Sequence, residues 1–479
     1  MQEYDFIKNG GNIMRKLLAF LLCAISLLTF CSCGKNGGGA TTNPADSTKP
    51  QGTGNTGETL VYFLNFKPEI ADVYDRIATA YKQETGVTVK VVTAASDTYE
   101  QTLMSEIAKK DAPTIFQLNG PIGYQSWKKY CLDLSDTALY SFLSDPTLAI
   151  IDDGGIYGIP YVIEGYGIIY NNDIVEDYFE LENRATDFVS MDQINNFEKL
   201  KALVEDMQAH KGELEIDGVF ASTSFSSGNH WRWNTHLANI PLYYELKKNT
   251  EFDDTVTAGL KTAEIGFDYS ENFKNIFDLY IENSGTQKGL LGSKSVNDSM
   301  AEFALGKVAM VQNGTWSWAD INGVAGNDVE QDDIRFLPIY TGVEGEEAQG
   351  LCVGTENYLA INSQVSADKQ KASIAFLEWL FSSETGKRFV LEELNFITPF
   401  NTFTQAEKPK DPLAKELVNW TQKSGVTSVP WTFASFPSEV FKERMSSALL
   451  EYAQGNGKWS DVENTVKNSW KEEFAANAR

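Results

Sequence analysis

The sequence predicts an α/β protein of two lobes, each an open sheet flanked by helices. The first observation is its length of 479 residues, which exceeds what one compact core usually supports and favours two domains or one two-lobed unit. The second is a composition of 42% hydrophobic, 12% aromatic and 22% charged residues, typical of a folded globular chain. The third is an alternation of strand-like and helix-like segments that begins near Thr59.

The alternation is clearest in the first third of the chain. Apolar runs at 59–66 and 114–118 are typical of buried strands, and 87–92 alternates like a strand. Apolar residues recur at helical spacing over 69–85, and again over 99–107. This order implies a largely parallel sheet with helical crossovers, whose ligands bind at the carboxyl ends of the strands. Further on we expect helices at 197–207, 273–281, 301–305, 372–381 and 440–452, and strands at 308–312, 335–340 and 358–362.

The charge balance excludes one class of partner. The chain carries 40 Lys and Arg against 66 Asp and Glu, a net charge of −26, and has no basic run beyond its first residues. Because phosphate binding needs a concentrated basic surface, we expect no nucleic-acid partner.

The N-terminal segment predicts export. Met14-Arg15-Lys16 precedes an apolar run at 17–30, and a basic head with an apolar stretch shorter than the ~20 residues of a membrane span is typical of a secretory signal. We therefore expect translation to start at Met14 and the signal to cover 14–32. The run ends in Thr29-Phe30-Cys31-Ser32-Cys33, which resembles the bacterial lipoprotein signal. That resemblance implies that Cys33 is lipidated and anchors the chain to the outer face of the cell membrane, with an ordinary cleaved signal as the alternative.

The segment 33–57 is rich in Gly, Thr, Asn, Ser and Pro, so it cannot bury enough apolar surface to fold, and we expect a flexible tether. Three of the five cysteines belong to the signal and the anchor, which leaves Cys131 and Cys352. One disulfide or two buried thiols both stay open for this pair. With three histidines and no metal-ligand spacing, we expect no metal site and no cofactor.

Enzyme signatures are missing from the sequence. It contains no G-x-S-x-G, no phosphate-binding loop and no H-E-x-x-H motif. A glycoside hydrolase or lyase with two catalytic carboxylates stays open as an alternative, because the spatial separation of such a pair is not visible in sequence.

Two segments instead combine tryptophan with polar residues and glycine, at 226–234 and 313–318. Sugars present flat C–H faces and a rim of hydroxyls, which aromatic rings and polar side chains match respectively. The alternative for any single tryptophan is that it fills the core.

Several motifs in order carry a family resemblance. From about Thr59 onward the chain resembles the maltodextrin-binding class of solute receptors that serve ABC importers. The motifs are Tyr157-Gly158-Ile159-Pro160-Tyr161, Tyr170-Asn171-Asn172-Asp173, 303–310 running into Asn313-Gly314-Thr315-Trp316, 375–380 with Glu384-Thr385-Gly386, and Ile397-Thr398-Pro399.

The resemblance implies a periplasmic-binding-protein-like fold, in which two α/β lobes joined by hinge segments close on a sugar without catalysing a reaction. It implies a membrane permease with a cytoplasmic ATPase as the partner, and we expect a monomer. The implied crossings lie near 164–167, 351–356 and 402–410. We expect Gly165, Gly167, Gly350 and Gly354 to absorb the backbone rotation. The first lobe would comprise 58–165 and 356–405, and the second 166–355 and 406–479.

The resemblance also implies roles for single residues. Trp316, the first tryptophan of the N-G-x-W motif, would stack on the sugar, whereas Trp318 would serve in packing. Glu164 would accept sugar hydroxyls at the hinge. Trp231 and Trp233 would belong to an aromatic cluster on the second lobe.

Three further residues complete the predicted site. Asn65 and Asn119 follow the first and third strands, in loops that carry polar ligands in relatives. Phe436, with Trp431 and Phe433, lies where the C-terminal region of the family supplies another stacking ring. Receptors of the same fold for a polyamine, a peptide or an iron complex, and an adhesive surface lipoprotein, are the remaining alternatives.

Overall fold

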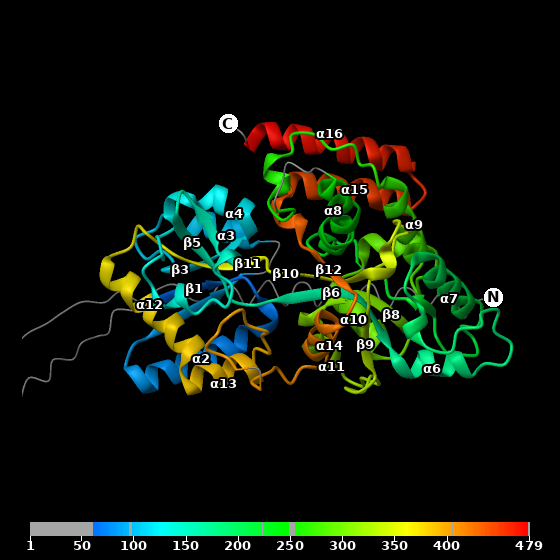
Figure 1. Ribbon diagram of the computed structural model, residues 1–479, viewed down its shortest axis with the longest axis horizontal. Coiled ribbons are helices and arrows are strands. Elements are labelled where there is room, and N and C mark those ends of the chain that lie inside the picture. The colour runs from blue at the N-terminus through cyan, green and yellow to red at the C-terminus, as the bar shows by residue number, and fades with distance from the viewer. Residues whose placement is uncertain (1–60, 95–97, 223, 249–253, 405, 478–479) are drawn as a thin grey trace, which may run out of the picture. The chain divides into compact units, whose positions relative to one another are not determined.

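The computed structural model describes residues 61–477, except 95–97, 223, 249–253 and 405 (Figure 1). The expected signal at 14–32, the tether at 33–57 and the anchor Cys33 lie outside the described residues. Two six-stranded sheets, each covered by helices, account for the fold. We call each sheet with its helices a lobe, and the prediction of a two-lobed α/β fold is confirmed.

The first sheet has the strand order β2-β1-β3-β11-β5-β4. The β1–β2 and β1–β3 pairs are parallel, as the sequence predicts for the first three strands, whereas β11 pairs antiparallel with both β3 and β5, and β4 antiparallel with β5. The sheet is therefore mixed rather than largely parallel. Its strands are β1 (Val61–Asn65), β2 (Val89–Thr93), β3 (Ile115–Asn119), β4 (Ile150–Asp152), β5 (Gly155–Pro160) and β11 (Asn357–Ile361).

Helices cover both faces of this sheet. Val61 and Phe63 point into the core beneath α2, α12 and α13, whereas Leu64 points into the core beneath α3 and α4. Helix α2 ends where Gly86 adopts a left-handed φ of 78° and donates to Lys82 O, as expected of a glycine cap. The helices of this lobe are α2 (Ala71–Thr85), α3 (Tyr99–Glu106), α4 (Gly120–Trp127), α5 (Ala138–Ser141), α12 (Ala367–Ser382) and α13 (Glu384–Glu392).

The second sheet has the order β12-β10-β6-β8-β7, with β9 also paired to β6. Strand β6 runs antiparallel to β8, β9 and β10, and the outer strands β7 and β12 pair in parallel with β8 and β10. These strands are β6 (Glu164–Asn171), β7 (Gly218–Phe220), β8 (Val308–Gly314), β9 (Ile334–Leu337), β10 (Gln349–Gly354) and β12 (Thr427–Pro430).

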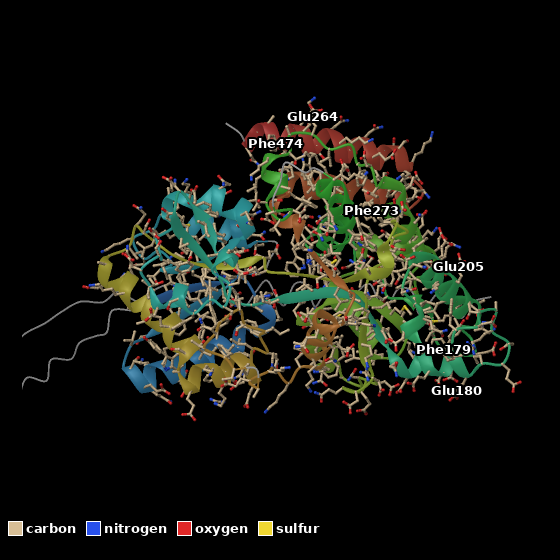
Figure 2. The ribbon with its side chains drawn as sticks, viewed as in Figure 1. Phe179, Glu180, Glu205, Glu264, Phe273 and Phe474 are labelled. Carbon is tan, nitrogen blue, oxygen red and sulfur yellow. The ribbon has the colours of Figure 1, made fainter. Side chains whose placement is uncertain are left out.

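Most helices of the second lobe bury one face and expose the other. Phe273 of α9 is fully buried, whereas Glu180, Glu205 and Glu264 are exposed and lie at the periphery of the lobe (Figure 2). A π-helix (Arg232–Leu237) leads directly into α8. The α-helices are α6 (Asn172–Glu180), α7 (Phe197–Ala209), α8 (Ala238–Lys247), α9 (Ser270–Glu282), α10 (Val296–Ala304), α11 (Trp318–Asn322), α14 (Pro412–Gln422), α15 (Glu439–Ala453) and α16 (Trp459–Asn477).

The chain passes between the lobes at three places. Strand β5 leads into β6 through 161–163, β10 into β11 through 355–356, and α13 into α14 through 393–411. The first and third passages are linked by an antiparallel bridge between Ile163 and Ile397. We propose these passages as the hinge segments of the two lobes.

Close packing explains why glycine occupies the four positions expected at the hinges. Gly165, Gly167, Gly350 and Gly354 lie in strands, and none has a positive φ. At each of them an added Cβ would come within 2.8 Å of a neighbouring heavy atom. Close approach of neighbouring groups, rather than an unusual backbone conformation, therefore explains these glycines.

Gly167→Ala is expected to lower the free energy of unfolding by about 1–3 kcal/mol, the usual cost of overpacking. Its Cβ would lie 2.6 Å from the carbonyl oxygen of Leu337, which is fixed by the β6–β9 pairing. Chemical unfolding measures the change. Gly212→Ala is the matched control, since a Cβ there meets nothing within 4 Å, and an equal loss in both variants would contradict the packing explanation.

The described part of the chain has neither a disulfide nor a group of side chains placed to bind a metal. Cys131 and Cys352 are both buried free thiols, so the disulfide alternative is wrong. Over the described residues, no group of three His, Cys, Asp or Glu side chains is placed to hold a metal ion. A search of the same residues finds no helix with the length and apolar character needed to span a bilayer.

Candidate functional site

Five rings gather at the end of the second sheet that faces the first lobe, and Phe433 packs against them 5.2 Å from the ring of His236. His236 lies at their centre: its ring centroid is 4.2 Å from Tyr166, 4.6 Å from Trp231, 5.4 Å from Trp316 and 6.0 Å from Trp431. Trp316 is itself 5.9 Å from Trp231 and 6.4 Å from Trp431. Trp231 and Trp316 keep part of their surface exposed, so the cluster offers indole surface to a ligand. We call these five residues the aromatic cluster.

Local structure explains how the cluster forms. Trp231 and His236 are five residues apart, and the π-helix brings residues at this spacing onto one side, which a regular α-helix does not. Trp316 follows β8 and folds its indole over Gly314, where a Cβ would collide with the ring. The glycine of the N-G-x-W motif is therefore required by the position of the tryptophan.

Charged groups from both lobes meet beside the cluster. Lys67, just beyond β1, places its Nζ 2.7 Å from Glu164 Oε1 and 3.7 Å from Glu69 Oε1. The Lys67 and Glu164 side chains are 8% and 7% exposed, so this is a buried ion pair. Burial lowers the pKa of Lys67, but the attraction of Glu164 and Glu69 outweighs it and raises the pKa above its ordinary value. Burial raises the pKa of Glu69.

A cavity of about 200 Å³ opens beside Glu164 and Glu69, the two carboxylates that contact Lys67. Its lining comes from both lobes, with Glu69 and Val73 on one side and Thr315, Trp316 and Glu164 on the other. The carboxyl ends of the parallel strands β1 and β3 lie on the same edge of the first sheet, which is where ligands of open α/β sheets bind. The structure thus joins an aromatic surface to buried polar groups.

The second passage between the lobes carries another acid, Glu356. Burial raises its pKa to about 7, while the nearby Lys442 and Lys67 act in the opposite direction. The main-chain carbonyl of Glu356 accepts from Gly120 N at 2.7 Å, which ties the passage to the start of α4. Burial likewise raises the pKa of Glu100 on α3, near Glu439 and Lys442 of α15.

Glu356→Gln is expected to be more stable than the parent above neutral pH, by more than about 1 kcal/mol at pH 8. A raised pKa means that the folded state keeps this proton longer than the unfolded chain, so its contribution to stability is lost as pH rises from about 4.5 to 7. Glutamine has no such charge to bury. Chemical unfolding of both proteins at pH 4.5 and pH 8 measures the difference, with the exposed Glu347→Gln as control. A glutamine variant less stable than the parent at pH 8 would contradict the prediction.

The structure brings together three of the predicted residues, Trp316, Trp231 and Glu164. Asn65 is fully buried and hydrogen-bonds the main chain of Lys67. Its Oδ1 accepts from Lys67 N at 3.2 Å, and its Nδ2 donates to Lys67 O at 2.8 Å. These bonds orient the lysine. Asn119 ends β3 at the same edge and pairs with Asn357 of β11. These two asparagines lie at the edge of the first sheet next to the site and do not line its aromatic surface.

Two predicted residues lie in the core of the second lobe instead. Trp233 is 1% exposed and stacks on Phe225 at 5.0 Å. Phe436 is 0% exposed and contacts Phe441 and Trp470. Both rings are packed against other aromatic side chains of the core and not against the aromatic cluster, so we leave both out of the site.

Sequence reasoning missed His236, Tyr166 and Lys67. The five-residue spacing brings Trp231 and His236 onto one side only in a π-helix, and no sequence pattern predicts that helix type here. Lys67 could have been found, because it lies just beyond Asn65, the last residue at the carboxyl end of the first strand.

Comparisons with known proteins agree with this architecture. Residues 76–416 match the family model described as bacterial extracellular solute-binding protein. The maltodextrin-binding protein MdxE of Bacillus subtilis (strain 168) is 23% identical over 481 residues, covering 96% of this chain and 99% of the relative. The chain is also similar in fold to two solved structures. A chitin oligosaccharide binding protein has a TM-score of 0.67 at 17% identity, covering 87% of this chain and 99% of the other. A sugar transporter from Bacillus licheniformis in complex with stachyose has a TM-score of 0.61 at 17% identity, covering 86% of this chain and 100% of the other.

Proposed function

Since the chain belongs to the bacterial extracellular solute-binding proteins, we propose that it captures an oligosaccharide between its two lobes and delivers it to the permease of an ABC importer. The observation that carries this proposal is the aromatic cluster beside the buried Lys67–Glu164 pair. Indole faces cover the C–H surface of a sugar ring, and the charged groups hydrogen-bond its hydroxyls. The names of relatives that bind maltodextrin, chitin oligosaccharides and stachyose support the same ligand class.

The two lobes would contribute different parts of the site. Trp231 and Trp316 of the second lobe stack on the sugar, whereas Lys67 and Glu69 of the first lobe bind its hydroxyls. A ligand that contacts both lobes stabilises their closed arrangement, because it binds that state more tightly. The permease would then recognise the closed receptor. We further propose that lipidation of Cys33 holds the monomeric receptor at the outer face of the cell membrane, where the tether at 33–57 lets it reach the permease.

Thermal unfolding against a panel of mono- and oligosaccharides tests the proposal, with the chain from Gly34 onward as the protein. A ligand bound only by the folded state raises the unfolding midpoint by mass action. We expect an oligosaccharide that raises the midpoint and is recovered intact by product analysis. Cleavage of the sugar would make the protein an enzyme, and a shift caused only by polyamines or peptides would contradict the ligand class.

A further inference from the structure

A buried cation lies beside the aromatic cluster without an ionic partner. Arg232, the first residue of the π-helix, is 1% exposed. Its Nη2 donates to Asn313 Oδ1 at 3.2 Å, whereas its Nε and Nη1 have no hydrogen-bond partner. Burial lowers its pKa to about 9, partly offset by Asp320, so the guanidinium is charged at neutral pH. Among the described residues, no carboxylate is close enough to form an ion pair with it.

Such a group calls for an explanation. Buried polar atoms nearly always have a hydrogen-bond partner, and an unpaired buried charge is among the most unfavourable arrangements in a protein. The buried Lys67 does not share this situation, because its Nζ lies near the carboxylates of Glu164 and Glu69. The charge that lacks a counterion at this site is therefore positive.

The guanidinium lies against a ring that we expect to stack on the sugar. Its Cζ lies 3.8 Å from the centroid of the Trp231 ring, and Trp231 is next to Trp316. The indole N–H groups of Trp316 and Trp431 are also buried and unpaired. Three neighbouring side chains thus present four hydrogen-bond donors without an acceptor.

We propose that the oligosaccharide is acidic, and that Arg232 binds its anionic substituent, a uronic acid carboxylate or a sulfate ester. This inference rests on the proposed function and names the ligand class for the same site. An anionic group of this kind only accepts hydrogen bonds, so it matches unpaired donors better than a hydroxyl, whose own proton also needs an acceptor. Unpaired acceptors, among them Thr355 Oγ1 on the second passage and Asn357 Oδ1 at the start of β11, suit the remaining hydroxyls of the sugar.

Calorimetric titration with matched pairs of saccharides tests the inference. One arm compares oligouronides with their methyl esters, which keep the ring and lose the charge, and the other compares sulfated oligosaccharides with their desulfated forms. The parent protein is expected to bind the acidic member of one arm about tenfold or more tightly than its neutral partner. The arm that shows this preference identifies the anionic group.

Arg232→Met is expected to reduce that preference by about tenfold or more, because the counterion of the anionic group is gone. Arg388→Met removes the same charge from the exposed surface of α13 and should keep the preference. If the methionine variant does not fold, Arg232→Lys tests the point, since lysine keeps the charge but loses the planar donor geometry and should weaken the preference.

Each outcome has a distinct meaning. Equal or tighter binding of the neutral members, or a preference that survives both Arg232 substitutions, would overturn the inference while leaving a sugar-binding protein. The absence of binding by every saccharide, acidic or neutral, would overturn the proposed function itself.

Discussion

Trp316→Ala is expected to weaken saccharide binding by about 2–4 kcal/mol, a loss typical of removing a central aromatic anchor. Trp316 both belongs to the aromatic cluster and lines the cavity beside Glu164 and Glu69. It is thus the residue at which the stacking surface and the polar groups meet. Truncation removes the stacking face and leaves a water-filled gap in its place. Calorimetric titration of the sugar found by thermal unfolding measures the change in affinity.

Trp420→Ala is the matched control for this change. Trp420 lies on α14 in the same lobe, is likewise partly buried, and donates from its Nε1 to Phe336 O, outside the aromatic cluster. Its loss should lower stability but not affinity. Unchanged affinity in the Trp316 variant, or an equal loss in both variants, would show that sugar does not stack on Trp316.

The sequence predicts the elements of the fold well, for identifiable reasons. Strongly periodic segments such as 197–207 and 440–452 appear as α7 and α15 with bounds that differ by two residues or fewer. Sheet order is different, because β11 enters the first sheet between β3 and β5, although it begins about two hundred residues after β5 in the chain. No local pattern encodes such a pairing, so the mixed character of the sheet follows only from the structure.

Local sequence patterns do not show which of several nearby aromatic residues belong to the candidate site. Trp231 and Trp233 are equally plausible in sequence, but Trp231, just before the π-helix, faces the cluster, whereas Trp233 within it packs on Phe225. Phe436 was placed by position along the chain, and the C-terminal helices bury it against Trp470. The motif that carries a steric requirement, Gly314 before Trp316, predicts a residue that the structure places in the aromatic cluster. Motifs tied to backbone geometry therefore transfer better than clusters of similar side chains.

Lys67→Met is expected to lower the free energy of unfolding by about 3–5 kcal/mol, the usual cost of breaking a buried ion pair from one side. The carboxylates of Glu164 and Glu69 would remain in a site where the former is 7% and the latter 19% exposed, without the cation that compensates them. Chemical unfolding at neutral pH measures the loss. Lys109→Met is the control, because Lys109 forms an exposed pair with Glu106 and such pairs contribute at most about 1 kcal/mol.

The double variant Lys67→Met, Glu164→Gln separates two origins of that loss. If the cost comes from an uncompensated buried carboxylate, removing the Glu164 charge should restore much of the stability, since an apolar or neutral pair in such a place is often no less stable than the ion pair. If the cost comes from lost contact between β1 and β6, the double variant should be as unstable as the single one. Because the two partners belong to different lobes, full recovery of stability with continued loss of sugar affinity would assign the pair to ligand-dependent closure rather than to folding.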